Sequence, residues 1–205
     1  FKNAVDKMIL DVQESGIEVH LNTVVTKEMI EEIKPDALIV AIGSSPFVLS
    51  IEGSERAIVA HDVLSEKVEV PGENVVIIGG GLVGFETAEF LASRQKKVTV
   101  LEMKEKALQD LGPLRQITAQ FAMAQMPITI ETSAIVERIE DHAVVASGKE
   151  YPYDSVIMAV GSKANDTSMY TDLGIPTYIV GDCKKAGVAL DAFKDAYHAV
   201  LEINK

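Results

Sequence analysis

The chain has 205 residues, of which 47% are hydrophobic and 24% charged, and its formal net charge is −12. This is the composition of a folded globular protein, and the acidic balance argues against nucleic acid or an anionic membrane as a partner, since both need clustered Lys and Arg. The single cysteine, Cys183, excludes a disulfide framework, a CxxC pair and a cysteine-built metal site. No stretch of roughly 18 apolar residues and no signal peptide is visible. We therefore expect a cytoplasmic protein without a metal site or membrane contact.

The first part of the chain predicts helices and strands in alternation. In order, we expect a helix over residues 5–12, a short strand over 17–21, a helix capped by Thr26, a buried strand over 37–42, and a connection over 47–72 with one short helix near 61–64. Helical spacing of apolar residues supports the first helix, and a continuous apolar run supports the buried strand.

The rest of the chain predicts a parallel sheet with one antiparallel interruption. In order, we expect a strand over 75–78, a glycine turn, a helix, a strand over 98–101, a helix from Pro113, a strand over 128–130, an antiparallel meander over 134–153, strands over 156–160 and 178–180, and a final helix. The first of these helices should carry Phe85, Ala88, Leu91 and Ala92 on its inner face, and the second should carry Leu114, Ile117, Phe121 and Ala124 as its apolar stripe. The final helix should carry Ala189, Phe193, Ala196 and Val200. This order predicts an α/β fold, with a Rossmann-like parallel sheet and a small antiparallel β-meander.

Part of the sequence repeats. Residues 36–44 (DALIVAIGS) match residues 154–162 (DSVIMAVGS), each with an acidic residue, a buried strand and a Gly-Ser exit. Two dinucleotide-binding units in one chain would produce this repeat. Buried strands also resemble one another by composition, so the repeat by itself leaves both interpretations open.

The glycine turn over residues 79–84 (GGGLVG) follows a predicted strand and opens a predicted helix. In such a turn Gly79 permits the tight bend, Gly81 leaves room for a pyrophosphate, and Gly84 lets the helix pack close to the strand. The helix N-terminus offers free N–H groups and a partial positive charge to the phosphates. The turn therefore predicts a dinucleotide site, the alternative being a glycine-rich turn that holds no ligand.

Glu102 ends the next strand, about 20 residues further on, where a carboxylate accepts hydrogen bonds from the adenosine ribose. It would also repel a 2′-phosphate, so NADH is favoured over NADPH, although Lys104 could reach such a phosphate. The candidate NAD(H)-binding residues are Gly79, Gly80, Gly81, Leu82, Val83, Gly84, Glu102, Met103, Lys104, Val160 and Gly161. No acid, base or nucleophile stands out, so we expect no catalytic residue in this chain.

The motifs together resemble a known family. Residues 37–46 (ALIVAIGSSP), the glycine turn, the strand and Gly-Ser over 156–162, and residues 178–183 (YIVGDC) occur in the order seen in flavoproteins with two dinucleotide domains. The close of the chain resembles the FAD/NAD(P)-binding C-terminal region of the NADH:flavin oxidoreductase family, which includes 2,4-dienoyl-CoA reductase, 2-enoate reductase and trimethylamine dehydrogenase. That family shares the broader fold of the pyridine nucleotide-disulfide oxidoreductases.

The resemblance implies a layout of domains and cofactors. An NAD(H) domain over residues 70–163 would be inserted into an incomplete FAD-type domain formed by residues 1–69 and 164–205, with Gly43 and Asp182 beside FAD. Full-length members carry an N-terminal TIM barrel with FMN and a 4Fe-4S cluster. The barrel, the cluster cysteines and the first strand-glycine-helix unit of the FAD domain are not in this sequence. We therefore expect weak or no FAD binding, and imperfect packing, swapping or a homodimer.

The resemblance also implies a function. We expect an NAD(H)-binding fragment that passes hydride from NADH to flavin and on to a substrate site outside this chain, and that is inactive alone. Two alternatives stay open: a fragment of a pyridine nucleotide–disulfide reductase, and a non-catalytic nucleotide-binding or electron-transfer scaffold subunit.

Overall fold

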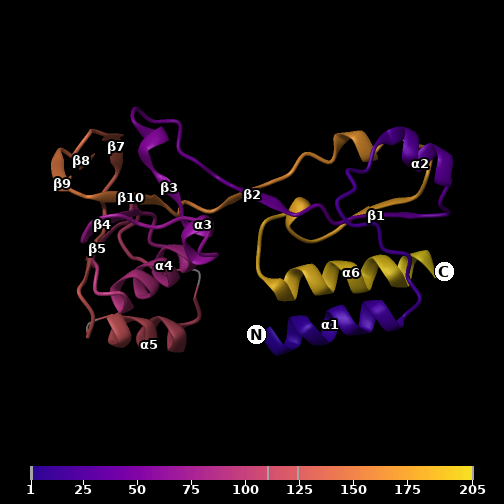
Figure 1. The fold of residues 1–205 in the computed structure, drawn as a ribbon, viewed down its shortest axis with the longest axis horizontal. Helices are drawn as coiled ribbons and strands as arrows, with labels where there is room; N and C mark the ends of the chain where they lie inside the picture. Colours follow the sequence, from indigo (N-terminus) through magenta and orange to yellow (C-terminus); the bar gives the residue numbers. More distant parts are fainter. Residues whose placement is uncertain (1, 110, 124, 205) are drawn as a thin grey trace.

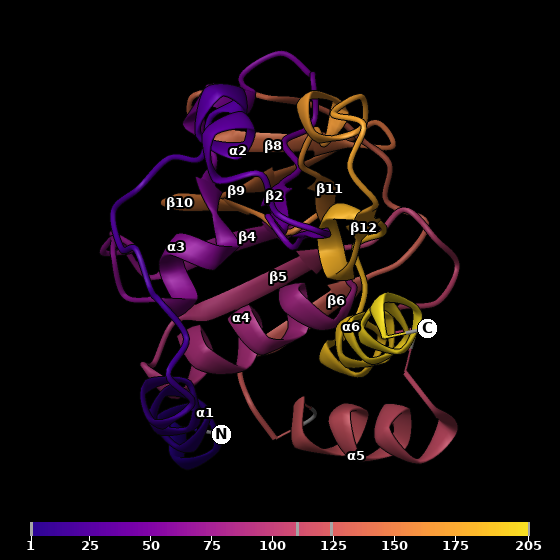
Figure 2. The same cartoon turned by 90° about the vertical axis from the view of Figure 1, so that its right-hand side faces the viewer.

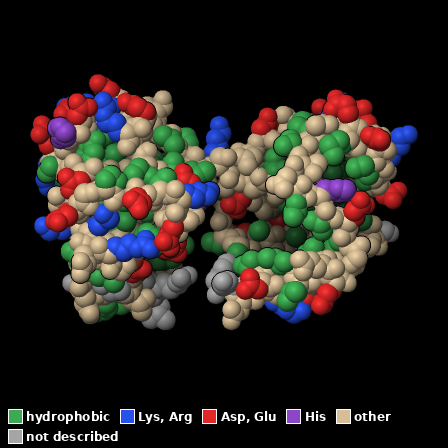
Figure 3. Space-filling view, viewed as in Figure 1, with side chains coloured by type: hydrophobic (Ala, Val, Ile, Leu, Met, Phe, Trp, Pro, Cys, Tyr) green, Lys and Arg blue, Asp and Glu red, His purple; other side chains and the backbone are tan. Residues whose placement is uncertain are grey.

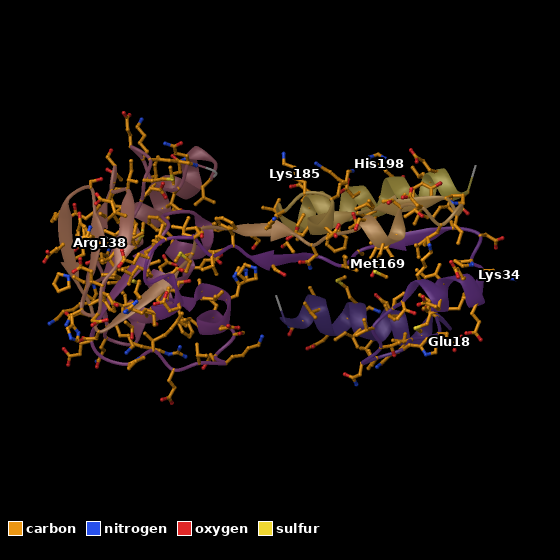
Figure 4. All side chains as sticks on the ribbon, turned by 90° about the horizontal axis from the view of Figure 1, so that it is seen from above. Glu18, Lys34, Arg138, Met169, Lys185 and His198 are labelled. Carbon is orange, nitrogen blue, oxygen red and sulfur yellow. The ribbon has the colours of Figure 1, made fainter. Side chains whose placement is uncertain are left out.

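The computed structural model describes residues 2–109, 111–123 and 125–204, which form two lobes joined by a narrow connection (Figure 1). The large-sheet lobe holds the described residues between 47 and 161, the small-sheet lobe holds residues 2–43 and 165–204, and the connecting ribbon is the pair β2 and β11. Figure 4 shows the same division, with Arg138 in the large-sheet lobe and Lys34 and His198 in the small-sheet lobe.

The large-sheet lobe is built on five parallel strands in the order β3-β10-β4-β5-β6. Their bounds are β3 (Ile58–Val59), β4 (Asn74–Ile78), β5 (Lys97–Leu101), β6 (Ile128–Glu131) and β10 (Ser155–Met158). The strands predicted over 75–78, 98–101 and 128–130 are confirmed, and the strand predicted over 156–160 forms but ends at Met158, whereas β3 is an extra strand within the expected connection. The central strands are apolar because both faces of the sheet are covered.

Successive residues of β4 pack on opposite faces of this sheet, as the pleat requires. Val75 and Ile77 join a buried cluster with α4 (Leu82–Ser93) and α3 (Ala60–Leu64). Val76 and Ile78 join a second cluster with the antiparallel meander on the other face. Figure 2 shows α4 on one side of β4 and β5, and β8 and β9 on the other.

The meander is confirmed as three antiparallel strands, β7 (Val136–Ile139), β8 (Ala143–Ala146) and β9 (Lys149–Pro152). The inner face of α4 is also confirmed, because Phe85, Ala88, Leu91 and Ala92 are buried. The meander and α4 together close the two faces of the sheet.

Helix α5 (Pro113–Met123) begins at the predicted proline but does not bury the predicted stripe. Phe121 is 68% exposed and Ile117 is exposed as well, whereas Met123 is buried against Phe85. The side chains of Leu114 and Ala124 lie outside the described residues. The expected stripe is wrong at Ile117 and Phe121 because the helix packs through the side that carries Met123.

The small-sheet lobe has two paired strands, β1 (Leu38–Val40) and β12 (Thr177–Ile179), which are parallel. Its helices are α1 (Lys2–Glu14), α2 (Lys27–Ile33), which Thr26 caps through the Met29 N–H, and α6 (Ala189–Ile203). Short 3₁₀ turns lie at Ser54–Arg56 in the large-sheet lobe, and at Ser168–Tyr170 and Gly181–Cys183 here.

The strand expected over residues 17–21 is wrong, because these residues are irregular and Leu21 is 78% exposed. A strand needs a neighbour to take its backbone hydrogen bonds, and among the described residues none lies beside this segment. Alternation alone could not show that the neighbour is absent.

Apolar side chains remain exposed over much of the small-sheet lobe, and Figure 3 shows hydrophobic side chains around a hollow there. The exposed residues include Val5, Met8, Ile9, Leu10, Val12, Leu190, Phe193, Tyr197, Val200 and Leu201. The final helix therefore forms where expected, but Phe193 and Val200 do not enter a core. Amphipathic helices normally cover such faces against another element.

The connecting ribbon pairs β2 (Ser44–Pro46) with β11 (Ser162–Ala164) in antiparallel register. These are the Gly-Ser exits of the two repeated segments. The repeated strands themselves lie in different sheets, β1 in the small-sheet lobe and β10 in the large-sheet lobe. The repeat in the sequence thus corresponds to one strand in each lobe, and the two chain exits run past each other between the lobes.

Candidate nucleotide-binding site

The glycine turn joins the end of β4 to the start of α4 and depends on glycine at its first position. Gly79 has a φ of +111°, a conformation that side chains disfavour, and a Cβ there would lie 2.3 Å from the Ala159 carbonyl oxygen. The end of β10 therefore lies directly against the turn.

Gly84 and Gly81 have opposite surroundings. A Cβ on Gly84 would lie 1.9 Å from the Gly79 carbonyl oxygen, so α4 can pack this close to the turn only with glycine there. A Cβ on Gly81 would meet no atom within 4 Å. Gly81 is the glycine whose missing side chain leaves open space beside the helix.

The N-terminus of α4 opens onto this space. Gly81 is the N-cap residue, no side chain caps the helix, and the first turn holds no acidic residue, all within the described part of the chain. The first N–H groups of a helix have no partner within the helix, and they carry partial positive charge. This arrangement suits a diphosphate.

Glu102 lies beside the turn, is only 7% exposed, and each of its carboxylate oxygens accepts from one backbone N–H group. The Gly80 N–H donates to its Oε2 at 2.7 Å, and the Lys104 N–H donates to its Oε1 at 2.8 Å. A carboxylate has about four acceptor sites, so it can also accept from ribose hydroxyls. The sequence indicated the ribose role, but it gave no sign that the same carboxylate holds the turn.

The residues after Glu102 are more open. Met103 and Lys104 are exposed, while the Lys104 carbonyl accepts from the Ser133 N–H at 2.9 Å. The loops that follow β5 and β6 are thus joined at one edge. Leu82 and Val83 are half-buried in the first turn of α4, next to Gly81.

Val160 and Gly161 are brought close to the glycine turn by the end of β10. A Cβ on Gly79 would lie 3.3 Å from the Val160 nitrogen, and Gly161 has a φ of +96° with no atom near its Cβ position. The Phe47 N–H donates to the Gly161 carbonyl at 2.9 Å. The candidate site therefore lies where the connecting ribbon leaves the large-sheet lobe.

Gly43 and Asp182 lie together at the other end of the ribbon. The Ser44 hydroxyl donates to Asp182 Oδ2 at 3.0 Å, and the Gly187 N–H donates to Oδ1 at 3.2 Å. Gly43, the neighbour of Ser44, has a φ of +71° with open space around its Cβ position. The Cys183 thiol is buried and donates to backbone carbonyl oxygens of residues 40 and 180, which indicates a structural role.

Two cavities of the large-sheet lobe differ in their relation to the turn. A cavity of about 520 Å³, lined by Asn74, Lys97 and Tyr153 among others, lies at the amino ends of the strands. Ligands of open α/β sheets bind at the carboxyl ends, so this is the wrong end for a dinucleotide. A second cavity of about 550 Å³ is lined by Phe85, residues 105–109 and Thr132, on the side of the turn.

Metal and membrane sites find no support in the described residues. They contain no group of three or more His, Cys, Asp or Glu side chains that could hold a metal ion. None of their helices combines the length and hydrophobicity that a bilayer crossing requires.

Comparison with known proteins decides the family. The model of the protein family Pyridine nucleotide-disulphide oxidoreductase matches residues 2–186 of this chain. The chain belongs to this family. The resemblance that the motifs indicated is therefore confirmed, and so is an NAD- and FAD-binding fold of the oxidoreductase type.

Relatives within the family are much longer than this chain. A NADH oxidase from Thermoanaerobacter brockii is 31% identical over an alignment of 211 positions, which covers 97% of this chain and 32% of the relative. A cinnamate reductase from Clostridium sporogenes is 34% identical over an alignment of 202 positions, which covers 94% of this chain and 30% of the relative. The chain thus spans about a third of the length of these relatives.

Two solved structures superpose on more than nine tenths of this chain. A 2-naphthoyl-CoA reductase is 31% identical with a TM-score of 0.82, over 92% of this chain and 30% of that protein. Histamine dehydrogenase from Rhizobium sp. 4-9 also gives a TM-score of 0.82, at 17% identity, over 98% of this chain and 34% of that protein. At that identity the second match shows the shared fold alone. The predicted α/β fold class is confirmed.

Proposed function

We propose that this chain is the NAD(H)-binding portion of a flavin-dependent oxidoreductase. The observation that carries the proposal is the uncapped N-terminus of α4 at Gly81, open to a ligand and flanked by the buried carboxylate of Glu102. When bound, NADH supplies a hydride for a flavin, and the electrons go on to a substrate site outside this chain. The chain's own residues bind and orient the nucleotide.

The binding roles follow from the positions of the residues. The backbone N–H groups of residues 81–83 face a diphosphate, because the helix N-terminus is open there. Glu102 accepts from the adenosine ribose and repels a 2′-phosphate, which favours NADH. Met103 and Lys104 flank the adenosine end, and Val160 and Gly161 flank the nicotinamide end, next to the connecting ribbon.

A flavin at Gly43 and Asp182 would lie across the connecting ribbon from the nicotinamide end. In this proposal the large-sheet lobe forms the NAD(H) domain, with β3 and α3 joined to the expected residues 70–163, and the small-sheet lobe forms the partial FAD-type domain. FMN and a 4Fe-4S cluster belong to an N-terminal TIM barrel of the parent protein.

The exposed apolar faces of α1 and α6 support the proposal that the FAD-type domain is incomplete. A sheet of two strands with uncovered helices is marginal by itself, and apolar faces of this kind mark contacts with another element. We propose that the FAD segment of the parent protein covers them, or a second copy of the chain where that segment is absent. FAD should then bind this chain weakly or not at all.

A dithiol reductase is the second candidate, because a dihydrolipoyl dehydrogenase from Acholeplasma laidlawii is 32% identical over an alignment of 149 positions, which covers 68% of this chain and 44% of the relative. That chemistry needs a redox cysteine pair. The chain has one cysteine, which is buried, so such a pair would have to lie outside it.

Calorimetric titration of the chain with NADH, NADPH and FAD tests the proposal. We expect NADH to bind, NADPH to bind more weakly because Glu102 repels its 2′-phosphate, and FAD to show little or no heat. A chain that binds no NADH contradicts the proposed function. Tighter binding of NADPH contradicts only the role given to Glu102.

A further inference from the structure

The segment that follows β5 folds back over the glycine turn and holds Gly80 on both sides. The Gly80 N–H donates to Glu102 Oε2 at 2.7 Å, and the Gly80 carbonyl accepts from the Leu108 N–H at 3.0 Å. The two peptide groups that flank Gly80 are therefore both fixed by residues 102–108.

The bond from Leu108 also sets the direction of the next N–H group. In a planar trans peptide the C=O and the N–H point in opposite directions. With the Gly80 carbonyl directed to Leu108, the Gly81 N–H of the same peptide is directed away from that segment. Gly81 is the residue beside which the structure is open.

Leu108 makes this bond from an unfavourable conformation. Its φ is +55°, in the left-handed region where a bulky residue is an outlier. Such residues persist only where their surroundings over-determine them, and they concentrate at functional sites. Here the side chain is 2% exposed and packs with Phe85 and Met123, while the carbonyl accepts from Gln116 Nε2 at 2.9 Å.

The packing ties the same residue to the helix that opens onto the candidate site. Phe85 lies in the first turn of α4, where its N–H donates to the Gly81 carbonyl at 3.1 Å. Leu108 thus contacts the glycine turn through its backbone and the start of α4 through its side chain. Neither contact is visible from the sequence, in which Leu108 is an ordinary apolar residue of a loop.

We propose that Leu108 is a positioning residue for nicotinamide dinucleotide binding, acting through the peptide between Gly80 and Gly81. This inference rests on the proposed function. Leu108 does not touch the nucleotide; it holds the peptide whose N–H meets the diphosphate. Loss of its anchored side chain lets that peptide rotate, so nucleotide affinity should fall by more than the loss of fold stability explains.

The test compares Leu108→Ala with Ile139→Ala, because both wild-type side chains are apolar and 2% exposed, and Ile139 packs in the meander cluster. NADH affinity is measured by calorimetry and fold stability by thermal melting. We expect Leu108→Ala to lower the affinity for NADH about tenfold, which corresponds to the free energy of one good hydrogen bond. Ile139→Ala should lower the melting temperature but keep NADH affinity within about twofold, since Ile139 packs with the meander on the face of the sheet opposite to α4.

Two further variants keep the test decisive. Leu108→Met keeps a bulky apolar side chain at this position and should bind NADH with wild-type affinity. Gln116→Ala removes the hydrogen bond to the Leu108 carbonyl, leaves the Leu108 side chain in place, and should weaken NADH even if Leu108→Ala fails to fold. Wild-type affinity in both Leu108→Ala and Gln116→Ala overturns the inference and leaves the proposed function intact. A wild-type chain that binds no NADH removes the proposed function, and the inference with it.

Discussion

Gly81 and Gly84 lie three residues apart and should respond in opposite ways to the same added methyl group. Gly81 has φ −81° and ψ −173°, which any residue adopts, and a Cβ there meets no atom within 4 Å. Gly81→Ala should therefore leave the free energy of unfolding within about 1 kcal/mol of wild type, since the loss of unfolded-chain entropy and the poorer N-cap offset each other. The methyl group takes the space that the diphosphate needs, so NADH affinity should fall at least about tenfold.

Gly84→Ala should instead damage the fold. Its Cβ would lie 1.9 Å from the Gly79 carbonyl oxygen, so α4 must move away from β4. Overpacking of this kind costs about 1–3 kcal/mol and at times more, which exceeds the gain of about 1 kcal/mol from placing Ala in a helix. The free energy of unfolding should fall accordingly.

Urea unfolding and calorimetric titration with NADH separate the two effects. Gly112→Ala is a useful control for binding, because its Cβ also meets no atom within 4 Å and it is not among the candidate residues. If Gly81→Ala binds NADH as tightly as wild type, the open space over Gly81 is not where the diphosphate lies. If Gly84→Ala unfolds at the wild-type urea concentration, the close approach of α4 to the turn is wrong.

Three further predictions concern Glu102, Asp154 and the flavin. Glu102→Ala should weaken NADH binding by about 1–3 kcal/mol, because a charged acceptor is lost, and should narrow the preference for NADH over NADPH. Parallel titrations with both nucleotides measure the two affinities. An unchanged ratio of the NADH and NADPH affinities contradicts this prediction. The pKa of Asp154 is lowered by hydrogen bonds from the backbone N–H groups of residues 73–74, so its stabilising effect is present above the ordinary value of 3.8 and is lost as pH falls through the lower folded value. Asp154→Asn should therefore lower the melting temperature at neutral pH, and the melting temperature of this variant should fall less in acid than that of wild type. Asp172→Asn is the control for removal of an exposed carboxylate. Equal acid sensitivity of Asp154→Asn and wild type would be inconsistent with this. The purified chain should carry little flavin by absorbance, and stoichiometric FAD would show that the FAD-type domain is complete enough to bind it.

The large-sheet lobe could be predicted from the sequence because its signals are local. Both faces of the sheet are covered, so its central strands are continuous apolar runs such as residues 75–78. The turn over residues 79–84 carries its own conformational requirements, and Pro113 starts α5 where expected. Each of these signals is contained in a few consecutive residues.

The small-sheet lobe and the ribbon could not be predicted because they depend on distant partners. Residues 17–21 alternate like a strand but have no neighbour to pair with in the described structure. Ser45 and Asn165 are hydrogen-bonded across the ribbon although 120 residues separate them, and neither segment alternates in hydrophobicity. The exposed faces of α1 and α6 have the same cause, since the sequence shows that a face is apolar but not what covers it.

The candidate site was predictable in its residues and not in its internal contacts. The glycines and Glu102 stand out by type and spacing. The two hydrogen bonds that hold Gly80, and the left-handed conformation of Leu108, leave no trace in the sequence because leucine is not a residue that favours that conformation. Positioning contacts of this kind come from the structure alone.

The most direct test of the account is to follow the backbone amide resonances of the chain while NADH is added. Binding at the N-terminus of α4 predicts the largest shifts at residues 79–84, with smaller shifts at Glu102 and Gly161. Shifts concentrated around Asn74, Lys97 and Tyr153, at the opposite end of the sheet, or no shifts at all, would contradict it.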